Sequence, residues 1–411
     1  MTPPPDVIRL GFIPLIDCAA LAVAREMDFA AREGLEIDTR KEGSWAAIRD
    51  KVAFGLYDGA HMLAGIPLAC RLGLGGVPGD IISPMALGFG GNAVTVSNAL
   101  HDALLAVDPG ATPNGAPDPS RIARALARVI ASRKAAGQPP LSFATVFPFS
   151  SHNYDLRYWL ATEGIDPDRD LNMGIIAPPR MAESLRSGWI DGYCVGEPWN
   201  LRAEAEGVGH ILLTKRDIWP CGPEKVLGLN EAWAKTHGEV VTRLVSALVQ
   251  AARWADQPEN RDDLSKILSH PDYINQDAAL IRRALDLGRH RFFETGATYP
   301  WRAHGAWLLS QMARWGQITA PADLKAIAEA VYRPDIYRAA LENQINLPGT
   351  EPRLLGGNAT AFTIPGADGT PFAMAPDRFL DGRPFDQEDP VGYAFAFPIG
   401  HPALTPADLR P

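Results

Sequence analysis

Residues 7–41 read VIRLGFIPLIDCAALAVAREMDFAAREGLEIDTRK, and this segment sets the fold class. The run VIRLGFIPL predicts a buried strand, and LEIDTRK predicts a second one. Between them lies a helix pattern, which we expect Asp17 to cap at its start and Gly34 to end. A strand, a helix and a second strand in this order form one unit of a parallel sheet. The segment therefore predicts an α/β fold with largely parallel sheets.

The same alternation of short strands and helices continues over the first two-thirds of the chain. From about Gly238 the pattern becomes helical, and the last sixty or so residues form a Gly- and Pro-rich tail that we expect to wrap the body. A chain of 411 residues is long enough for two lobes. The predicted division places residues 1–97 and 218–411 in lobe 1 and residues 98–217 in lobe 2.

The composition excludes some classes of function. With 39 Lys and Arg against 48 Asp and Glu, the formal charge is −9, which disfavours a broad nucleic-acid-binding face. It still allows one small anion in a locally positive cleft. The four cysteines form no CxxC pair and lie in apolar runs, which favours buried thiols over disulfides or zinc ligands. No stretch is apolar enough for a membrane span.

The first residues, MTPPP, lack the charged start, apolar core and cleavage site of a secretory signal. The first strand pattern begins soon afterwards, at Val7. We therefore expect a cytoplasmic protein. The alternative is that a signal has been removed.

Two strand-to-helix junctions carry groups that could hold an anion. In FPFSSHNY, Ser150, Ser151 and His152 stand where a strand pattern gives way to a helix pattern, and EGSWAAIRD repeats this arrangement with Ser44 and Trp45. Free N–H groups and the positive end of the dipole favour anions at helix N-termini. Such junctions tend to face one crevice in open α/β sheets. Taken singly, each is also consistent with an ordinary helix cap or a core residue.

Three further positions could complete such a site. Lys225 in GPEKVLGL supplies a full charge, Asn92 after GFGG supplies an amide, and Gly196 in CVGEPWN allows a close backbone approach. Each also fits an ordinary surface or turn residue. The chain contains no GxSxG, P-loop or HExxH pattern, and its nine histidines show no metal-ligand spacing. We therefore expect no enzyme activity, cofactor or metal.

Longer segments resemble the nitrate-binding proteins of nitrate transport systems. They include SSHNYDLRYWLATEGIDPD, GEPWNLRAEAEGVGH, GPEKVLGL, YPWRAHGAWLLSQMARWG and, near the end, DRFLDGRPFDQEDP, as well as most of residues 9–37, 42–52 and 58–69. The resemblance implies a two-lobed fold of the periplasmic-binding-protein type II kind. Two strands would cross between the lobes, and the ligand would lie in the cleft.

The resemblance also implies the ligand set. Nitrate would contact Trp45, His152, the backbone of Gly196 and Lys225, while a glutamine of the family falls at Asn92. Asparagine is one methylene shorter, so its contact and the preference between nitrate and nitrite are open. Bicarbonate-binding relatives carry an acidic residue and a calcium ion where this chain has its lysine, which favours nitrate or nitrite without a metal.

The missing signal pattern makes the chain most similar to the cytoplasmic nitrate/nitrite sensors of the NasS type. That resemblance implies a protein partner, an RNA-binding antiterminator of the NasT type, which is held without ligand and released when nitrate or nitrite binds. No direct contact with nucleic acid is implied. The first alternative is the receptor of an ABC transporter, and the second is an enzyme on the same fold, like the pyrimidine-synthesising relatives of thiamine metabolism.

Overall fold

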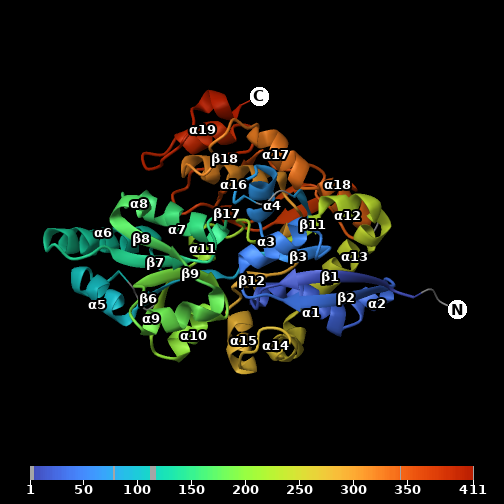
Figure 1. The fold of residues 1–411 in the computed structure, drawn as a ribbon, viewed down its shortest axis with the longest axis horizontal. Helices are drawn as coiled ribbons and strands as arrows, with labels where there is room; N and C mark the ends of the chain where they lie inside the picture. Colours follow the sequence, from blue (N-terminus) through green and yellow to red (C-terminus); the bar gives the residue numbers. More distant parts are fainter. Residues whose placement is uncertain (1–3, 77–78, 112–116, 343, 411) are drawn as a thin grey trace.

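The computed structural model describes residues 4–76, 79–111, 117–342 and 344–410, and it contains two five-stranded sheets that lie side by side (Figure 1). The first sheet has the order β2-β1-β3-β11-β4. Its strands are β1 (Asp6–Phe12), β2 (Leu35–Lys41), β3 (Gly59–Leu63), β4 (Ile81–Ala86) and β11 (Lys225–Asn230). The expected α/β class is confirmed.

The second sheet has the order β10-β6-β9-β7-β8. Its strands are β6 (Asn92–Ser97), β7 (Leu141–Thr145), β8 (Leu171–Ile175), β9 (Gly192–Gly196) and β10 (Gly209–Thr214). Both sheets are largely parallel, as expected, because four strands of each run in one direction. In each, one strand that arrives from the other sheet, β11 or β6, runs antiparallel to both of its neighbours.

The chain passes between the two sheets twice. It leaves the first sheet after β4, forms β5 (Phe89–Gly90) and enters the second sheet as β6; later it returns from β10 to β11. These are the two crossovers that the family resemblance implied. The division of the lobes at residue 97 stays a proposal, but it assigns β6 to lobe 1, whereas the hydrogen bonds of β6 run to β9 and β10.

The helices cover the faces of both sheets (Figure 1). Those before the second crossover are α3 (Trp45–Ala53), α4 (Ile66–Arg71), α5 (Asn98–Val107), α6 (Pro119–Ala135), α7 (Ser151–Thr162), α8 (Pro167–Asp170), η2 (Pro178–Arg180), α9 (Met181–Arg186), α10 (Trp199–Ala205) and α11 (Lys215–Ile218). After β11 follow α12 (Glu231–Thr236), α13 (Gly238–Asp256), η3 (Pro258–Asn260), α14 (Arg261–Ser269), α15 (Ala278–Asp286), η4 (Glu294–Gly296), α16 (Arg302–Arg314), α17 (Leu324–Val331) and α18 (Pro334–Leu341).

The helix expected between β1 and β2 is divided into several parts. It comprises η1 (Ile16–Cys18), α1 (Ala19–Glu26) and α2 (Phe29–Arg32), with Asp28 at a φ of 60° before the last part. Gly34 ends the segment at a φ of 70°, as expected. The cap expected at Asp17 is wrong, because Asp17 lies inside η1 and its carboxylate pairs with residues of other elements.

The C-terminal tail packs along the body, and its last part lies with α16 and α17 at one end of the molecule (Figure 1). It contains β13 (Leu354–Leu355), β14 (Gly357–Asn358), β15 (Phe362–Pro365), β16 (Pro371–Met374), β17 (Asp377–Arg378), β18 (Phe385–Asp386), α19 (Pro390–Phe395) and η5 (Pro406–Leu409). Phe379 packs between Trp219 and Tyr158, at centroid distances of 4.3 and 5.3 Å. The tail therefore contacts the segment that leads into the second crossover and helix α7.

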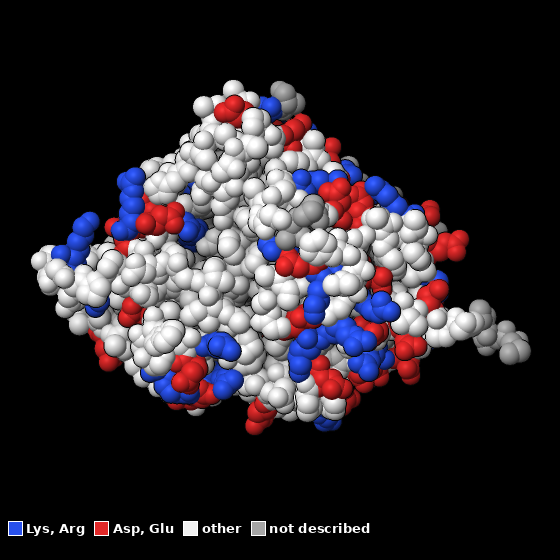
Figure 2. Space-filling view, in the orientation of Figure 1, with Lys and Arg blue, Asp and Glu red and all other residues white. Residues whose placement is uncertain are grey.

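Three further expectations can be compared with the structure. The four cysteines are buried and free, as expected. In the part of the chain that the structure describes, no helix combines the length and the apolar character that a membrane crossing needs. Figure 2 shows Lys and Arg beside Asp and Glu around this face rather than one positive field.

Candidate functional site

The five positions expected to bind an anion all lie at the ends of structural elements. Trp45 begins α3, His152 is the second residue of α7, Asn92 begins β6, Gly196 ends β9, and Lys225 begins β11. The structure brings them into one buried group between the sheets, whose links are described below. We call Asp17, Asn92, His152, Glu224 and Lys225 the central cluster.

The two strand-to-helix junctions have the expected caps. The Ser150 hydroxyl accepts a hydrogen bond from the backbone N–H of Asn153 at 3.1 Å, and Ser44 accepts one from Ala47 at 3.2 Å. Ser151 does not act as a cap. Its hydroxyl donates to the Glu224 carboxylate at 2.8 Å, so it belongs with the residues around the central cluster.

Lys225 is a fully desolvated charge. Its Nζ donates to Asp17 Oδ2 at 2.8 Å and to Glu224 Oε1, and it lies 5.7 Å from the centroid of the Trp45 ring. Burial acts to lower the pKa of Lys225, but the two carboxylates outweigh it and raise the pKa above its ordinary value. The lysine therefore stays charged, and two negative groups already compensate it.

The Glu224 carboxylate lies where most of the expected ligand-binding groups converge. It accepts hydrogen bonds from Lys225 Nζ, Asn92 Nδ2 and the Ser151 hydroxyl, and its Oε1 lies 3.8 Å from His152 Nε2. Burial acts to raise the pKa of Glu224, but the electrostatic influence of its neighbours, Lys225 above all, outweighs it and holds the pKa below its usual value. Glu224 is therefore an ionised carboxylate inside the protein.

Asp17 connects the lysine to the Trp45 side of the site. Its Oδ1 lies 2.7 Å from His61 Nε2, and the His61 ring lies 5.5 Å from the Trp45 ring, measured between centroids. Burial acts to raise the pKa of Asp17, but Lys225 and His61 overcome it and hold the pKa well below its usual range. Asp17 thus links the ammonium group of Lys225 to His61 and the Trp45 side of the site.

Several buried polar atoms around the cluster have no hydrogen-bond partner among the described residues. They are Trp45 Nε1, His61 Nδ1, Asn92 Oδ1 and both ring nitrogens of His152 and of His290. Burial is the main reason that the pKa of His152 falls to about 3 and that of His290 to about 4, so both rings are neutral and each carries one N–H. A buried polar group without a partner costs about 1–3 kcal/mol. The donors among these atoms, Trp45 Nε1 and one N–H each of His152 and His290, are available to a ligand with acceptor atoms.

Two glycines make room for these groups. Gly196 lies opposite Asn92 in the β6–β9 ladder, and a Cβ there would lie 3.2 Å from a Leu15 methyl group and 3.7 Å from Asn92 Oδ1. Gly91 has a φ of 91°, and a Cβ there would overlap the His290 ring, at 2.3 Å from Nε2. The GFGG turn therefore brings the backbone close to a histidine that the sequence did not single out.

A second buried ion pair lies next to the central cluster. Lys215 Nζ donates to Asp155 Oδ2 at 2.6 Å and lies 3.8 Å from Glu224 Oε2. Burial raises the pKa of Asp155 to about 6, although Lys215 opposes the shift. This pair extends the polar network from α7 to α11.

Sequence reasoning missed Asp17, His61, Glu224 and His290. Glu224 had a signal, since it adjoins Lys225 in an otherwise apolar segment, GPEKVLGL. The others had none that distinguishes them from a helix cap or a scattered histidine.

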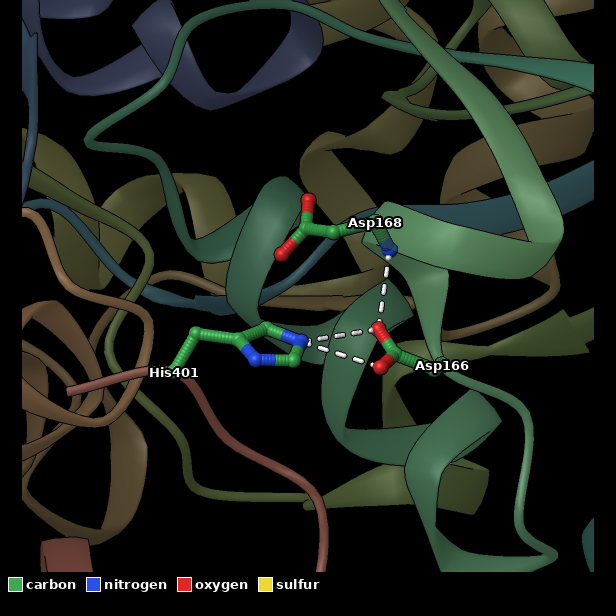
Figure 3. A group of neighbouring side chains, drawn as sticks. All are labelled: Asp166, Asp168 and His401. Atoms are coloured by element: carbon green, nitrogen blue, oxygen red, sulfur yellow. Dashed lines mark hydrogen bonds and ion pairs between the residues drawn. The ribbon is translucent and has the colours of Figure 1, made fainter.

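One group of potential metal ligands occurs among the described residues, at Asp166, Asp168 and His401 (Figure 3). His401 Nε2 lies 3.0 Å from both oxygens of Asp166. Arg157 forms a two-point ion pair with Asp168, at 2.7 and 2.8 Å. We call these four residues the tail cluster. Because an arginine already holds one of its carboxylates, the cluster is a set of ion pairs that ties the tail to α7 and α8.

Comparison with known proteins gives one family and a set of transport proteins. The model of the NMT1-like family matches residues 1–269. The chain is 34% identical, over 95% of its length, to the nitrate import ATP-binding protein NrtC of Synechocystis and to the bicarbonate transport ATP-binding protein CmpC of Synechococcus elongatus. It spans 55% of each of those proteins, about half of their length.

The nitrate/nitrite binding protein NrtA of Synechococcus elongatus is matched over most of its length. It is 30% identical, and the match covers 94% of this chain and 85% of NrtA. The crystal structure of the periplasmic nitrate-binding protein NrtA from Synechocystis superposes with a TM-score of 0.80 and 27% identity, over 97% of this chain and all of that one. The two-lobed fold expected from the resemblance is confirmed by this match.

Proposed function

The chain belongs to the NMT1-like family, and from this premise we propose that it binds nitrate or nitrite between its two sheets. One observation carries the proposal: a desolvated lysine, Lys225, lies beside the unpaired N–H groups of Trp45 and His152. A planar, singly charged anion that accepts hydrogen bonds weakly needs this combination of one buried charge and several fixed donors.

The names of the relatives are compatible with two anions, because the nitrate and bicarbonate transport proteins are equally similar to the chain. Lys225 favours nitrate or nitrite. The carboxylates that could hold a cation here, Asp17 and Glu224, are both engaged with its ammonium group. A positive charge at the centre of the cluster repels a metal ion, so an anion that needs a metal partner fits less well.

Isothermal titration calorimetry with nitrate, nitrite, bicarbonate and chloride tests the proposal. We expect binding of nitrate or nitrite and none of chloride at the same concentrations. Lys225→Ala should abolish the binding, whereas Lys266→Ala should not, since Lys266 is an exposed lysine paired with Asp263. A wild-type protein that binds neither nitrate nor nitrite at millimolar concentration contradicts the proposal.

The finer role follows the sequence resemblance: a cytoplasmic nitrate/nitrite sensor that holds an RNA-binding antiterminator of the NasT type and releases it when the anion binds. A buried site between two sheets supports such a switch, since an anion that contacts both sides favours one arrangement of the lobes. In this role the protein is a binding protein and not an enzyme.

The second candidate is the anion receptor of an ABC transporter. The names of the relatives favour it, because they describe import and transport. Pull-down experiments separate the two roles. A sensor retains a NasT-type antiterminator without nitrate and loses it with nitrate, whereas a receptor retains membrane transport subunits and no antiterminator under either condition.

A further inference from the structure

The Glu224 carboxylate occupies the position at which the proposed anion ligands converge. Lys225 and Asn92 donate to it, and His152 Nε2 lies 3.8 Å away. A carboxylate is planar and carries one negative charge, as nitrate does. Three of the five groups assigned to the anion are thus directed toward an internal group of similar shape and charge.

We propose that an oxyanion binds in this site together with one proton, which neutralises Glu224. The inference rests on the proposed function and adds to it a residue that controls affinity through pH. In the protonated form, the carboxyl group of Glu224 offers an O–H donor to the incoming anion instead of a second negative charge.

The charges around Glu224 explain why a proton is needed. Lys225 is already shared by Asp17 and Glu224, and the other nearby cation, Lys215, pairs with Asp155. An anion beside Lys225 would be the third negative charge around one ammonium group. One ammonium group keeps two carboxylates ionised, but a third negative charge in the same buried site adds repulsion that no further cation offsets, so one of the three groups takes a proton.

Glu224 is better placed to accept this proton than the histidines are. It faces Lys225 from its own segment, His152 and Asp155 from α7, Lys215 from α11 and Asp17 from η1. Burial strongly lowers the pKa of His152, and among the described residues no carboxylate lies within hydrogen-bond distance of its ring.

The remaining titratable groups lie further from the carboxylate. His61 of β3 contacts Asp17, His290 of β12 (His290–Arg291) packs on Gly91, and Cys194 is a buried thiol of β9 whose pKa burial raises well above its usual value. They influence the pKa of Glu224 only through longer-range electrostatic interactions. Asp155 has a pKa of about 6, so it can itself take up a proton when the pH falls from 8 to 6. It is therefore the group that a control must exclude.

The direction in which pH changes the affinity for nitrate follows from comparing the protein without and with the bound anion. Without the anion, the pKa of Glu224 is low and the carboxylate is ionised. With the anion beside it, the pKa rises, so the complex holds one more proton over the range between the two values. Affinity for nitrate should therefore rise as pH falls, by at most about tenfold per pH unit for one proton.

Calorimetry of nitrate binding at pH 6, 7 and 8, in two buffers that differ in ionisation enthalpy, measures the affinity and the number of protons taken up per anion. We expect the wild-type protein to bind more tightly at pH 6 than at pH 8 and to take up between about half and one proton per anion. Glu224→Gln should take up no proton and should bind nitrate at pH 8 at least about tenfold more tightly than the wild-type protein.

Asp155→Asn is the matched control, and it should keep the proton uptake. Wild-type binding with equal affinity at pH 6 and pH 8 and without proton uptake overturns this inference but leaves the proposed function intact. The inference is also overturned if Asp155→Asn no longer takes up a proton while Glu224→Gln still does. Absence of nitrate binding by both the wild-type protein and Glu224→Gln at every pH overturns the proposed function itself. If Glu224→Gln does not fold, the proton uptake of the wild-type protein decides.

Discussion

The central cluster and the tail cluster contain the same kinds of charged side chain, yet their surroundings differ. In the tail cluster each carboxylate has an arginine beside it, Arg157 at Asp168 and Arg169 at Asp166, and the side chains of Asp168 and His401 are 39% and 31% exposed. In the central cluster the groups are fully desolvated, two carboxylates share one lysine, and neighbouring donors have no partner. The comparison indicates that incomplete pairing under burial, rather than charge itself, is what makes the central cluster the candidate for the proposed anion site.

Lys225→Met should have the largest effect. It leaves Asp17 and Glu224 buried without their cation, and removal of one partner from a buried ion pair costs about 3–5 kcal/mol. We expect a loss of this order in the free energy of unfolding, measured in urea at neutral pH, together with loss of nitrate binding. The matched change Lys266→Met, in an exposed pair, should cost less than about 1 kcal/mol. Equal free energies of unfolding for the two variants would mean that the buried pairing of Lys225 stabilises the fold no more than an exposed ion pair does.

The fold and the ligand positions follow from the sequence more readily than their partners do. Trp45 follows β2 of the first sheet and His152 follows β7 of the second, each at the carboxyl end of a parallel strand. Lys225 begins β11, which runs antiparallel to its neighbours. Glu224 meets Asn92 across 132 positions, and His61 meets Asp17 across 44. Those contacts depend on the crossovers, which local patterns do not specify.

The same limit explains the wrong cap at Asp17 and bears on the lobe boundary at residue 97, which stays a proposal. Asp17 has the pattern of a helix cap, because its local sequence says nothing of the lysine 208 positions away. Strand β6 looks like the end of the first lobe, because it follows β4 closely, but its hydrogen-bond partners, β9 and β10, come about a hundred residues later. Tertiary pairing therefore decided both cases.

His152→Leu should separate affinity from stability. Both ring nitrogens of His152 are buried without a partner, so an apolar side chain removes unsatisfied atoms at little cost in packing. We expect a free energy of unfolding within about 1 kcal/mol of the wild-type value and nitrate affinity lower by roughly 10- to 100-fold, as for loss of a hydrogen bond to a charged group. Thermal melts with and without nitrate measure both effects. A strong loss of stability with unchanged affinity would make His152 a core residue.

Gly196→Ala should have a smaller effect, confined to affinity. The added Cβ lies 3.2 Å from a Leu15 methyl group, which can shift, and reaches toward Asn92 and Asp17. We expect nitrate affinity to fall by about fivefold to tenfold, as for a mild steric clash of about 1 kcal/mol. Gly174→Ala is the matched control in the same sheet, because its Cβ would meet only a carbonyl oxygen of Phe143, at 3.8 Å. Equal affinities of the two variants would place the anion away from the β9 end.

His401→Ala should have the smallest effect, because it removes one partly exposed partner of a cluster that is already paired. The ion pair with Asp166 joins the tail to α8, and pairs of this kind contribute about 0–1 kcal/mol. We expect a small change in the free energy of unfolding, unchanged nitrate affinity, and no stabilisation of the wild-type protein by added zinc or magnesium, since Arg157 holds Asp168. A large metal-dependent rise in the melting temperature that His401→Ala removes would contradict this. Such a rise would mean that a carboxylate paired with an arginine can exchange that partner for a metal ion. Complete pairing of the charged groups would then no longer identify a purely structural contact.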